Sequence, residues 1–235
     1  MHVPDGVLPL WVYLLFLAIS IPTLGIAVRK VNRRFDDRLA PYMGVLAAVI
    51  FAAQFVNFPI PPSSGHLVGT TMLAVMLGPW AAMVIIALVL CVQALYGDGG
   101  ILAFGVNFFN MGILGAFIGW GLSFILFKGL RRVITSEKSR VLVATSIAAF
   151  ITIVITAFIL GLELLTVPGL TFEFVYVITG LHVFVAVGEA IITFFILLYF
   201  VKAKPKLISF LKESATAEGF GIRVAPEEVI VEGAH

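Results

Sequence analysis

Long runs of hydrophobic residues, separated by short polar loops, fill the chain up to about residue 201. A helix needs about 20 apolar residues to cross the hydrocarbon layer of a membrane, unless it tilts or the bilayer thins. Most of the runs approach that length. The pattern therefore predicts an all-α integral membrane protein, a bundle of seven transmembrane helices. The predicted helices cover residues 9–28, 41–58, 67–79, 80–96, 104–127, 141–165 and 174–201.

The boundary between the third and fourth runs depends on the pair Gly78-Pro79. An unbroken helix over 67–96 would be too long for one span, and Pro79 lacks the N–H that such a helix would use. We therefore expect two short helices joined by a tight turn, each marginal in length. One long kinked helix, with six spans in total, is the alternative.

Basic residues occupy every second loop. They gather in 29–38, 128–140 and 202–206, whereas the loops 58–66, 97–103 and 166–173 contain no Lys or Arg. Because positively charged loops stay on the cytoplasmic side, we expect the N-terminus outside, inserted toward the bundle, and the C-terminus in the cytoplasm. An odd number of spans gives the same result.

Composition narrows the class of protein. The chain is 61% hydrophobic and 12% charged, about half the charge of a soluble globular protein. Its net charge of +2 resides in short loops, so we expect no nucleic acid as a partner but a lipid bilayer around it. No Gly-x-x-x-x-Gly-Lys-Ser/Thr loop occurs. We therefore expect that the chain does not hydrolyse ATP and is not an enzyme.

The first two residues carry most of a metal chelate. The α-amine of Met1, with the backbone nitrogen and imidazole of His2, can close a five- and a six-membered ring on one ion. His2 is too bulky for the usual removal of the initiator, so we expect Met1 to be retained. Pro4 has no N–H with which to extend the chelate. The plain alternative is a chain that starts with Met and a polar residue by chance.

A second histidine is expected at the same face. His66 begins the third span, directly after the stiff segment Pro59-Ile60-Pro61-Pro62. A lone His at a helix start is commonly a cap or an interfacial side chain. Together with Met1 and His2, however, it would complete an all-nitrogen set suited to square-planar Ni²⁺, with Cu²⁺ possible and Co²⁺ close behind. The set has no carboxylate or thiolate, which disfavours Mg²⁺, Ca²⁺ and a zinc protease.

Five polar residues are candidates for orienting the ligands or positioning the N-terminus: Asp5, Ser64, Asp98, Asn107 and Asn110. Metal-bound imidazoles normally donate their other N–H to such groups. The two aspartates could instead be turn residues before glycine. The two asparagines are three residues apart and share a helix face. They could bind the N-terminal segment or join helices to one another.

Two ionisable residues of the last run lie apart from these motifs. His182 and Glu189 are seven residues apart, hence on one helix face, and could form a buried pair. Ionisable groups inside a membrane are functional candidates by default. We assign neither of them to the metal site.

These motifs occur in a specific order. They are Met-His-Val-Pro-Asp-Gly at 1–6, Asn57-Phe58-Pro59-Ile60-Pro61, Ser64-Gly65-His66-Leu67, Leu77-Gly78-Pro79-Trp80, Gln93-Ala94-Leu95, Gly97-Asp98-Gly99-Gly100 and Asn107-Phe108-Phe109-Asn110-Met111. The chain thereby resembles the NikM/CbiM family, the substrate-capture membrane component of nickel and cobalt energy-coupling-factor transporters. The motifs span residues 1–111, and the topology extends the likeness to about residue 201.

The resemblance implies a function and a set of partners. Ni²⁺, or else Co²⁺, would be held by Met1, His2 and His66, and Pro4-Asp5-Gly6 resembles the nickel branch more than the cobalt branch. Residues 1–203 would form the transmembrane metal-capture domain. The sequence after residue 203 matches none of these family motifs, and its own short apolar face between lysines predicts a cytoplasmic tail over 204–235, partly amphipathic or disordered. The partners would be a transmembrane coupling subunit, two ATPase subunits and a small accessory membrane subunit.

The same resemblance implies a place in the cell, and other functions remain open. The chain would lie in the plasma membrane of a prokaryote, with the metal site facing outside. A cobalt-specific capture subunit of this family is the first alternative. A vitamin-binding capture subunit would need a larger pocket and no free N-terminus. A membrane-embedded metalloenzyme would need an open coordination position beside a general base.

Overall fold

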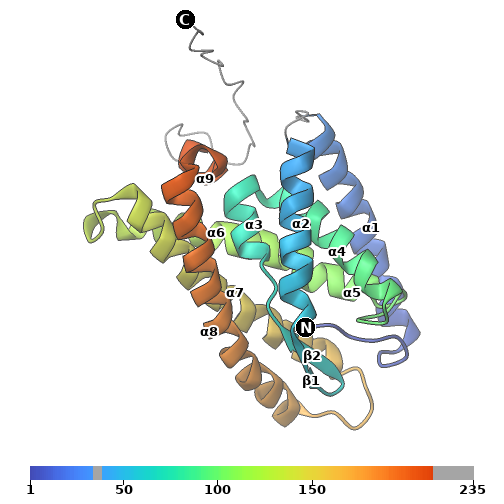
Figure 1. Cartoon of the computed structure of the whole chain (residues 1–235). Coiled ribbons are helices and arrows are strands. Elements are labelled where there is room, and N and C mark those ends of the chain that lie inside the picture. The colour runs from blue at the N-terminus through green and yellow to red at the C-terminus, as the bar shows by residue number, and fades with distance from the viewer. Residues whose placement is uncertain (34–38, 214–235) are drawn as a thin grey trace, which may run out of the picture.

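The computed structural model describes residues 1–33 and 39–213, and it is mostly helical (Figure 1). Within these described residues, four helical segments are long and apolar enough to cross a membrane: α1 (Leu10–Asn32), the segment Phe104–Arg132, α7 (Glu137–Leu164) and α8 (Phe172–Ala203). Two further apolar helices, α2 (Leu39–Phe55) and α4 (Pro79–Leu95), are shorter. Each predicted run thus contains a helix, in a chain with the features of a multi-pass membrane protein.

The break at Gly78-Pro79 lies where the sequence places it. Helix α3 (Thr70–Leu77) ends at Gly78, which has a φ of +85°, and Pro79 opens α4. Two helices rather than one kinked helix are therefore confirmed here. However, the 8 residues of α3 reach only about 12 Å at 1.5 Å per residue, against a hydrocarbon thickness of about 30 Å. This run is too short to be a span by itself.

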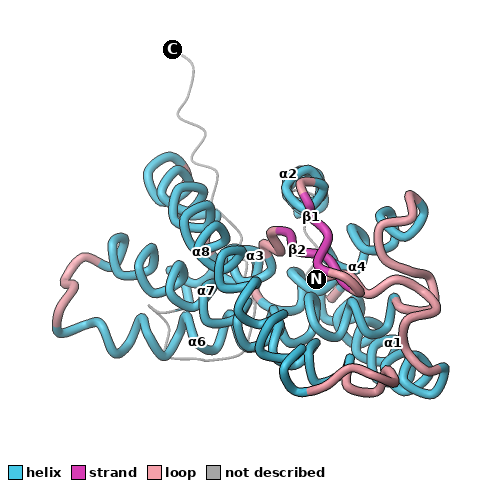
Figure 2. The backbone as a smooth tube through the Cα atoms, turned by 90° about the horizontal axis from the view of Figure 1, so that it is seen from below, coloured by secondary structure: helices cyan, strands magenta, loops and turns pink. Residues whose placement is uncertain are grey.

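The residues before α3 form a β-hairpin that we had expected to be a loop. Strands β1 (Asn57–Ile60) and β2 (Ser63–His66) pair antiparallel, with Asn57 opposite His66. A Cβ atom on Gly65 would lie 2.5 Å from the ring of Phe58, so any larger residue there would have to displace this ring. The hairpin and the N-terminus lie at the end of the fold opposite α9 (Figure 1). Figure 2 views this end and shows the N-terminus beside both strands.

The fifth run is continuous but changes its helical winding. It starts as α5 (Phe104–Asn107), widens into the π-helix η1 (Phe108–Leu114) and continues as α6 (Gly115–Gly129) and the 3-10 turn η2 (Leu130–Arg132). A π-helix bonds residue i to i+5 and is frequent at functional sites. Its wider turn rotates the side chains that follow it relative to those before it.

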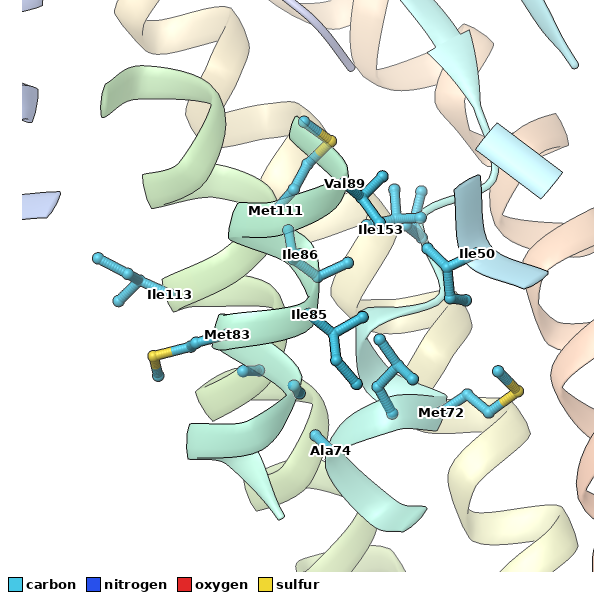
Figure 3. Close-up of a cluster of buried hydrophobic side chains, with 14 of the residues drawn as sticks. Ile50, Met72, Ala74, Met83, Ile85, Ile86, Val89, Met111, Ile113 and Ile153 are labelled. Atoms are coloured by element: carbon cyan, nitrogen blue, oxygen red, sulfur yellow. The ribbon is translucent and has the colours of Figure 1, made fainter. Parts of the chain in front are cut away.

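The core lies where α2, α3, α4, η1 and α7 meet. Each of these elements contributes buried apolar side chains to one cluster, among them Ile50, Met72, Ile86, Met111 and Ile153 (Figure 3). Helix α7 also packs along α8. This apolar contact fixes the frame on which the hairpin and the N-terminal segment rest.

The start of the expected tail packs against the bundle. After α8 come η3 (Pro205–Leu207) and α9 (Ser209–Glu213). The ring of Phe210 is buried and meets the rings of Trp120 and Phe127 edge-on. Residues 214–235, the rest of that tail, lie outside the described residues.

Candidate metal centre

The first eight residues form no helix or strand, yet they are anchored from several sides. Met1 and Val3 are fully buried. The side chain of Asn107, at the end of α5, binds Val3 at both backbone groups. Its Oδ1 accepts the Val3 N–H at 2.8 Å, and its Nδ2 donates to the Val3 carbonyl at 3.0 Å. Asn107 thus pairs with the segment as a neighbouring strand would. Of the two roles that the sequence left open for it, this is the binding of the N-terminal segment.

Tyr13 of α1 fixes the turn that follows. Its hydroxyl accepts the N–H groups of Val7 and Leu8, at 3.1 and 3.0 Å, and donates to the Pro4 carbonyl at 2.9 Å. Three backbone groups of a non-helical turn are therefore satisfied by one buried side chain. The sequence analysis missed this residue, because a tyrosine inside an apolar run carries no signal of its partners.

Asp5 joins the N-terminal segment to the loop before α5. Its carboxylate accepts the N–H groups of Ile101 at 3.0 Å and Ala103 at 2.8 Å. A Cβ atom on Gly100 would overlap this carboxylate, so the close approach requires glycine there. Asp5 therefore anchors two chain segments to each other rather than orienting an imidazole.

The hairpin holds His2 from the other side. The backbone N–H of His2 donates to Ser64 Oγ at 3.2 Å, and Ser63 Oγ donates to the His2 carbonyl at 2.9 Å. The His2 side chain is buried, with 2% of its surface exposed. Ser64 was a predicted positioning residue, whereas Ser63 was not singled out.

The two histidines lie side by side. Their rings stack with centroids 4.4 Å apart and planes 24° apart, and His66 is 1% exposed. His66 Nδ1 lies 2.7 Å from the carbonyl oxygen of Leu67. Since a carbonyl only accepts, Nδ1 holds the hydrogen and Nε2 carries the free lone pair. Nε2 is buried and has no hydrogen-bond partner among the residues that the structure describes, so it is available as a ligand.

Asp98 closes the site toward the loop 97–100. One of its oxygens lies 3.0 Å from His2 Nδ1, and the other accepts the side-chain N–H of Asn57 at 3.1 Å. Asp98 thereby connects the N-terminus, the loop and strand β1. Of the two aspartates, this is the one that contacts an imidazole.

Burial keeps the nitrogen groups in their neutral forms. Desolvation lowers the pKa of the Met1 α-amine well below 8.0, although the nearby Asp98 charge opposes this shift. Desolvation likewise lowers the pKa values of His2 and His66. Burial alone would raise the pKa of Asp98, but the His2 ring, the amine and Asn57 together lower it. Near neutral pH the site therefore offers lone pairs and one carboxylate.

Three other polar residues make contacts outside the candidate ligand set. Asn110 donates to Glu163 Oε2 at 2.7 Å and so joins η1 to α7, the second of the two roles that the sequence left open for it. Asn107 and Asn110 diverge because the π-helix begins between them, and a common face holds only for an α-helix. His182 and Glu189 are not paired to each other. His182 Nδ1 donates to the Ile178 carbonyl, and Glu189 accepts backbone N–H groups from the segment after His66.

The centre depends on the N-terminal nitrogens. Within residues 1–33 and 39–213, no set of three or more His, Cys, Asp and Glu side chains is arranged to hold a metal ion. A small cavity beside Met1 has room for about one water molecule. It is lined by Met1, Thr70, Asn110, Thr152, Thr156 and Glu189 among others. The arrangement thus provides an amine, a peptide nitrogen and two imidazoles, all shielded from solvent.

Comparison with known proteins identifies the family. A protein of Haloquadratum walsbyi named as a metal transport protein is 35% identical over 88% of this chain and 93% of its own length. A protein of Archaeoglobus fulgidus named as a fused nickel transport protein, NikMN, is 34% identical over 88% of this chain and 68% of its own length. A crystal structure of a transition metal transporter superposes with a TM-score of 0.77 at 29% identity, covering 92% of this chain and 99% of that one. The family described as "Cobalt uptake substrate-specific transmembrane region" matches residues 2–207, so this chain belongs to the CbiM family.

Proposed function

We propose that this chain captures Ni²⁺, with Co²⁺ as the alternative cargo, for import across the membrane. One observation carries the proposal: the Met1 α-amine is fully buried beside two stacked imidazoles. Burying an unpaired ammonium ion is costly, so the site favours the neutral amine, whose lone pair can bind a metal. A buried amine among buried imidazoles has no other evident use.

Four nitrogens form the proposed ligand set. They are the amine of Met1, the backbone nitrogen and Nδ1 of His2, and Nε2 of His66. His66 presents a free lone pair at Nε2 because its Nδ1 donates to Leu67. A proton and a metal ion cannot share one lone pair, so metal binding at His2 Nδ1 replaces its contact with Asp98. Loss of the His2 amide proton likewise ends its hydrogen bond to Ser64.

The planar nitrogen set favours nickel, and the family description keeps cobalt as the second candidate. A deprotonated peptide nitrogen fixes a flat arrangement, which suits Ni²⁺ better than the tetrahedral preference of Zn²⁺. Relatives named as nickel transport proteins and as cobalt transport proteins both occur. Competition between the two ions for the purified protein distinguishes the cargoes, and we expect Ni²⁺ to bind more tightly.

Orientation and energy supply complete the proposal. The C-terminal end of α1, with Arg29 and Lys30, lies with α9 at the end of the fold opposite the hairpin (Figure 1). By the positive-inside rule, the metal site then faces outside. A coupling membrane subunit, two ATPase subunits and a small accessory membrane subunit would drive the inward delivery.

Two added residues test the metal site. Two glycines placed ahead of Met1 move the amine away from His2 and break the five-membered ring, so we expect no measurable Ni²⁺ binding by calorimetry of the purified protein. The matched control inserts two glycines after Val133, which is 80% exposed in the loop before α7, and should bind like the wild type. Wild-type affinity in the N-terminal extension would refute the proposed ligands.

A further inference from the structure

Glu189 of α8 is a buried carboxylate that faces the segment following His66. It is 3% exposed. Its Oε2 accepts the Val68 N–H at 2.8 Å, and its Oε1 accepts the Gly69 N–H at 2.6 Å. Both oxygens are therefore engaged by the backbone of one short segment. Burying a carboxylate costs free energy unless it is paired or hydrogen-bonded. Here hydrogen bonds from two backbone N–H groups stabilise it.

This segment also contains the hydrogen-bond acceptor of His66. The His66 Nδ1–H donates to the Leu67 carbonyl at 2.7 Å. The Leu67 carbonyl and the Val68 N–H belong to the same planar peptide group. A continuous chain of hydrogen bonds therefore runs from the imidazole of His66, through this peptide, to the carboxylate of Glu189.

We propose that Glu189 is a positioning residue for the metal ligand His66 and acts on it through the Leu67–Val68 peptide group. The inference rests on the proposed function, because it concerns the His66 ligand of that site. Metal-bound histidines donate their second N–H to a carboxylate or a carbonyl, which fixes the ring and strengthens its donor nitrogen. Here a carboxylate lies behind the carbonyl. It polarises the peptide, and hydrogen bonds linked in this way strengthen one another.

The chain of hydrogen bonds has a mechanical and an electronic effect. Gln54 of α2 also holds this segment, since its Nε2 donates to the Val68 carbonyl at 2.8 Å. That carbonyl belongs to the next peptide group, not to the one that His66 contacts. Gln54 therefore restrains the backbone without taking part in the chain that ends on His66. Substitutions at Gln54 and Glu189 therefore distinguish restraint of this backbone segment from polarisation of the Leu67–Val68 peptide group.

The test compares Glu189→Gln with two controls in the purified full-length protein, using Ni²⁺ alone as the probe. The amide of Gln is neutral and offers one oxygen to two N–H groups. We expect Ni²⁺ affinity about 10- to 100-fold weaker, the range typical of such partners, and a visible d–d band at lower energy because His66 is a weaker donor. Glu163→Gln is the matched control. Glu163 is also buried but contacts Asn110 instead, and we expect wild-type affinity and spectrum.

Gln54→Leu serves as the structural control. It should lower the midpoint of thermal unfolding and leave the d–d band unchanged. If Glu189→Gln does not fold, Glu189→Asp keeps the charge with a shorter reach and should shift the band less. A wild-type affinity and spectrum in a folded Glu189 variant would overturn the inference while wild-type binding upholds the proposed function. No Ni²⁺ binding by the wild type would instead refute the proposed function itself.

Discussion

The N-terminal segment 1–8 and helix α7 satisfy their buried backbone N–H and carbonyl groups in opposite ways. In α7 the backbone groups bond one another, and the buried hydroxyl of Thr152 also donates within the helix, to the Ala148 carbonyl. In the N-terminal segment, side chains from α1, α5 and β2 supply the partners. Buried backbone groups need partners in either case. The helix is therefore robust to single polar substitutions, whereas the segment depends on a few distant side chains.

The largest expected effect comes from removing the ligands themselves. His2→Ala removes one imidazole and its six-membered chelate ring, whereas His66→Ala removes only one donor. We expect both variants to lose transport. Residual Ni²⁺ binding, measured by equilibrium dialysis, should be weaker in His2→Ala. Wild-type affinity in His66→Ala would require a different fourth ligand, and Asp98 would be the next residue to test.

Asn107→Leu attacks the anchoring of the segment without touching a ligand. Val3 is buried, and the substitution leaves its N–H and its carbonyl without hydrogen-bond partners. Each unsatisfied group costs about 1–3 kcal/mol in stability. The segment then spends less time in its binding-competent position, and apparent affinity falls in proportion to that fraction. We expect Ni²⁺ affinity at least about tenfold weaker, measured by calorimetry. Unchanged affinity would mean that the metal alone suffices to order the N-terminus.

The pH dependence of Ni²⁺ binding tests the burial of the site. The free pKa values, about 7.7–8.0 for the amine and about 6.5 for imidazole, would place strong proton competition between pH 8 and pH 5.5. Desolvation lowers all three pKa values, so these groups stay neutral and able to bind metal to lower pH. At pH 7 only the His2 amide proton then has to leave.

The expected result is a tenfold gain in affinity per pH unit near pH 7, with a steeper dependence only at lower pH, where the amine and the rings become protonated. Calorimetry in buffers of different ionisation enthalpy measures the protons released. Two or more protons released per ion at pH 7 would show that the amine or a ring is still protonated there. The burial seen in the structure would then not lower the pKa values as argued.

The sequence predicts the helices well because their signals are local. Apolar runs mark each helix, and Gly78-Pro79 marks the break between α3 and α4. The hairpin was missed because Asn57–Ile60 has a proline and little alternation of polar and apolar residues. Helix α3 is shorter than the predicted run 67–79 because residues 67–69 are not helical, and Gly69 before the helix has a φ of +74°.

The site was predictable only where a motif marks it. The motifs single out Met1, His2, His66 and Asp98, and the predicted topology puts all four at the same face of the membrane. In the structure the two histidine rings stack, and Asp98 contacts His2. Contacts made by residues outside the motifs carry no such signal. Tyr13 and Glu189 each bind backbone groups of another segment, and the sequence does not say which segment lies opposite. The direction of Asn110 depends on the π-helix, which apolar periodicity does not reveal.

The smallest effects are expected from removing one hydroxyl, either beside the N-terminal segment or within a helix. Tyr13→Phe removes the hydroxyl that satisfies Val7, Leu8 and Pro4 in the N-terminal segment. The bonds to Val7 and Pro4 are only partly buried, so water can replace the hydroxyl there. We therefore expect a loss of about 1–2 kcal/mol in stability and a few-fold weaker Ni²⁺ binding.

Thr179→Val is the matched substitution in α8. It removes a hydroxyl that only donates to the Val175 carbonyl, one turn back in the same helix. Such a bond adds little to a helix, so we expect less than about 0.5 kcal/mol and no change in Ni²⁺ affinity. Midpoints of thermal unfolding with and without Ni²⁺ measure both variants. Equal shifts would contradict the comparison, because they would mean that the N-terminal segment depends on its side-chain partners no more than a helix does.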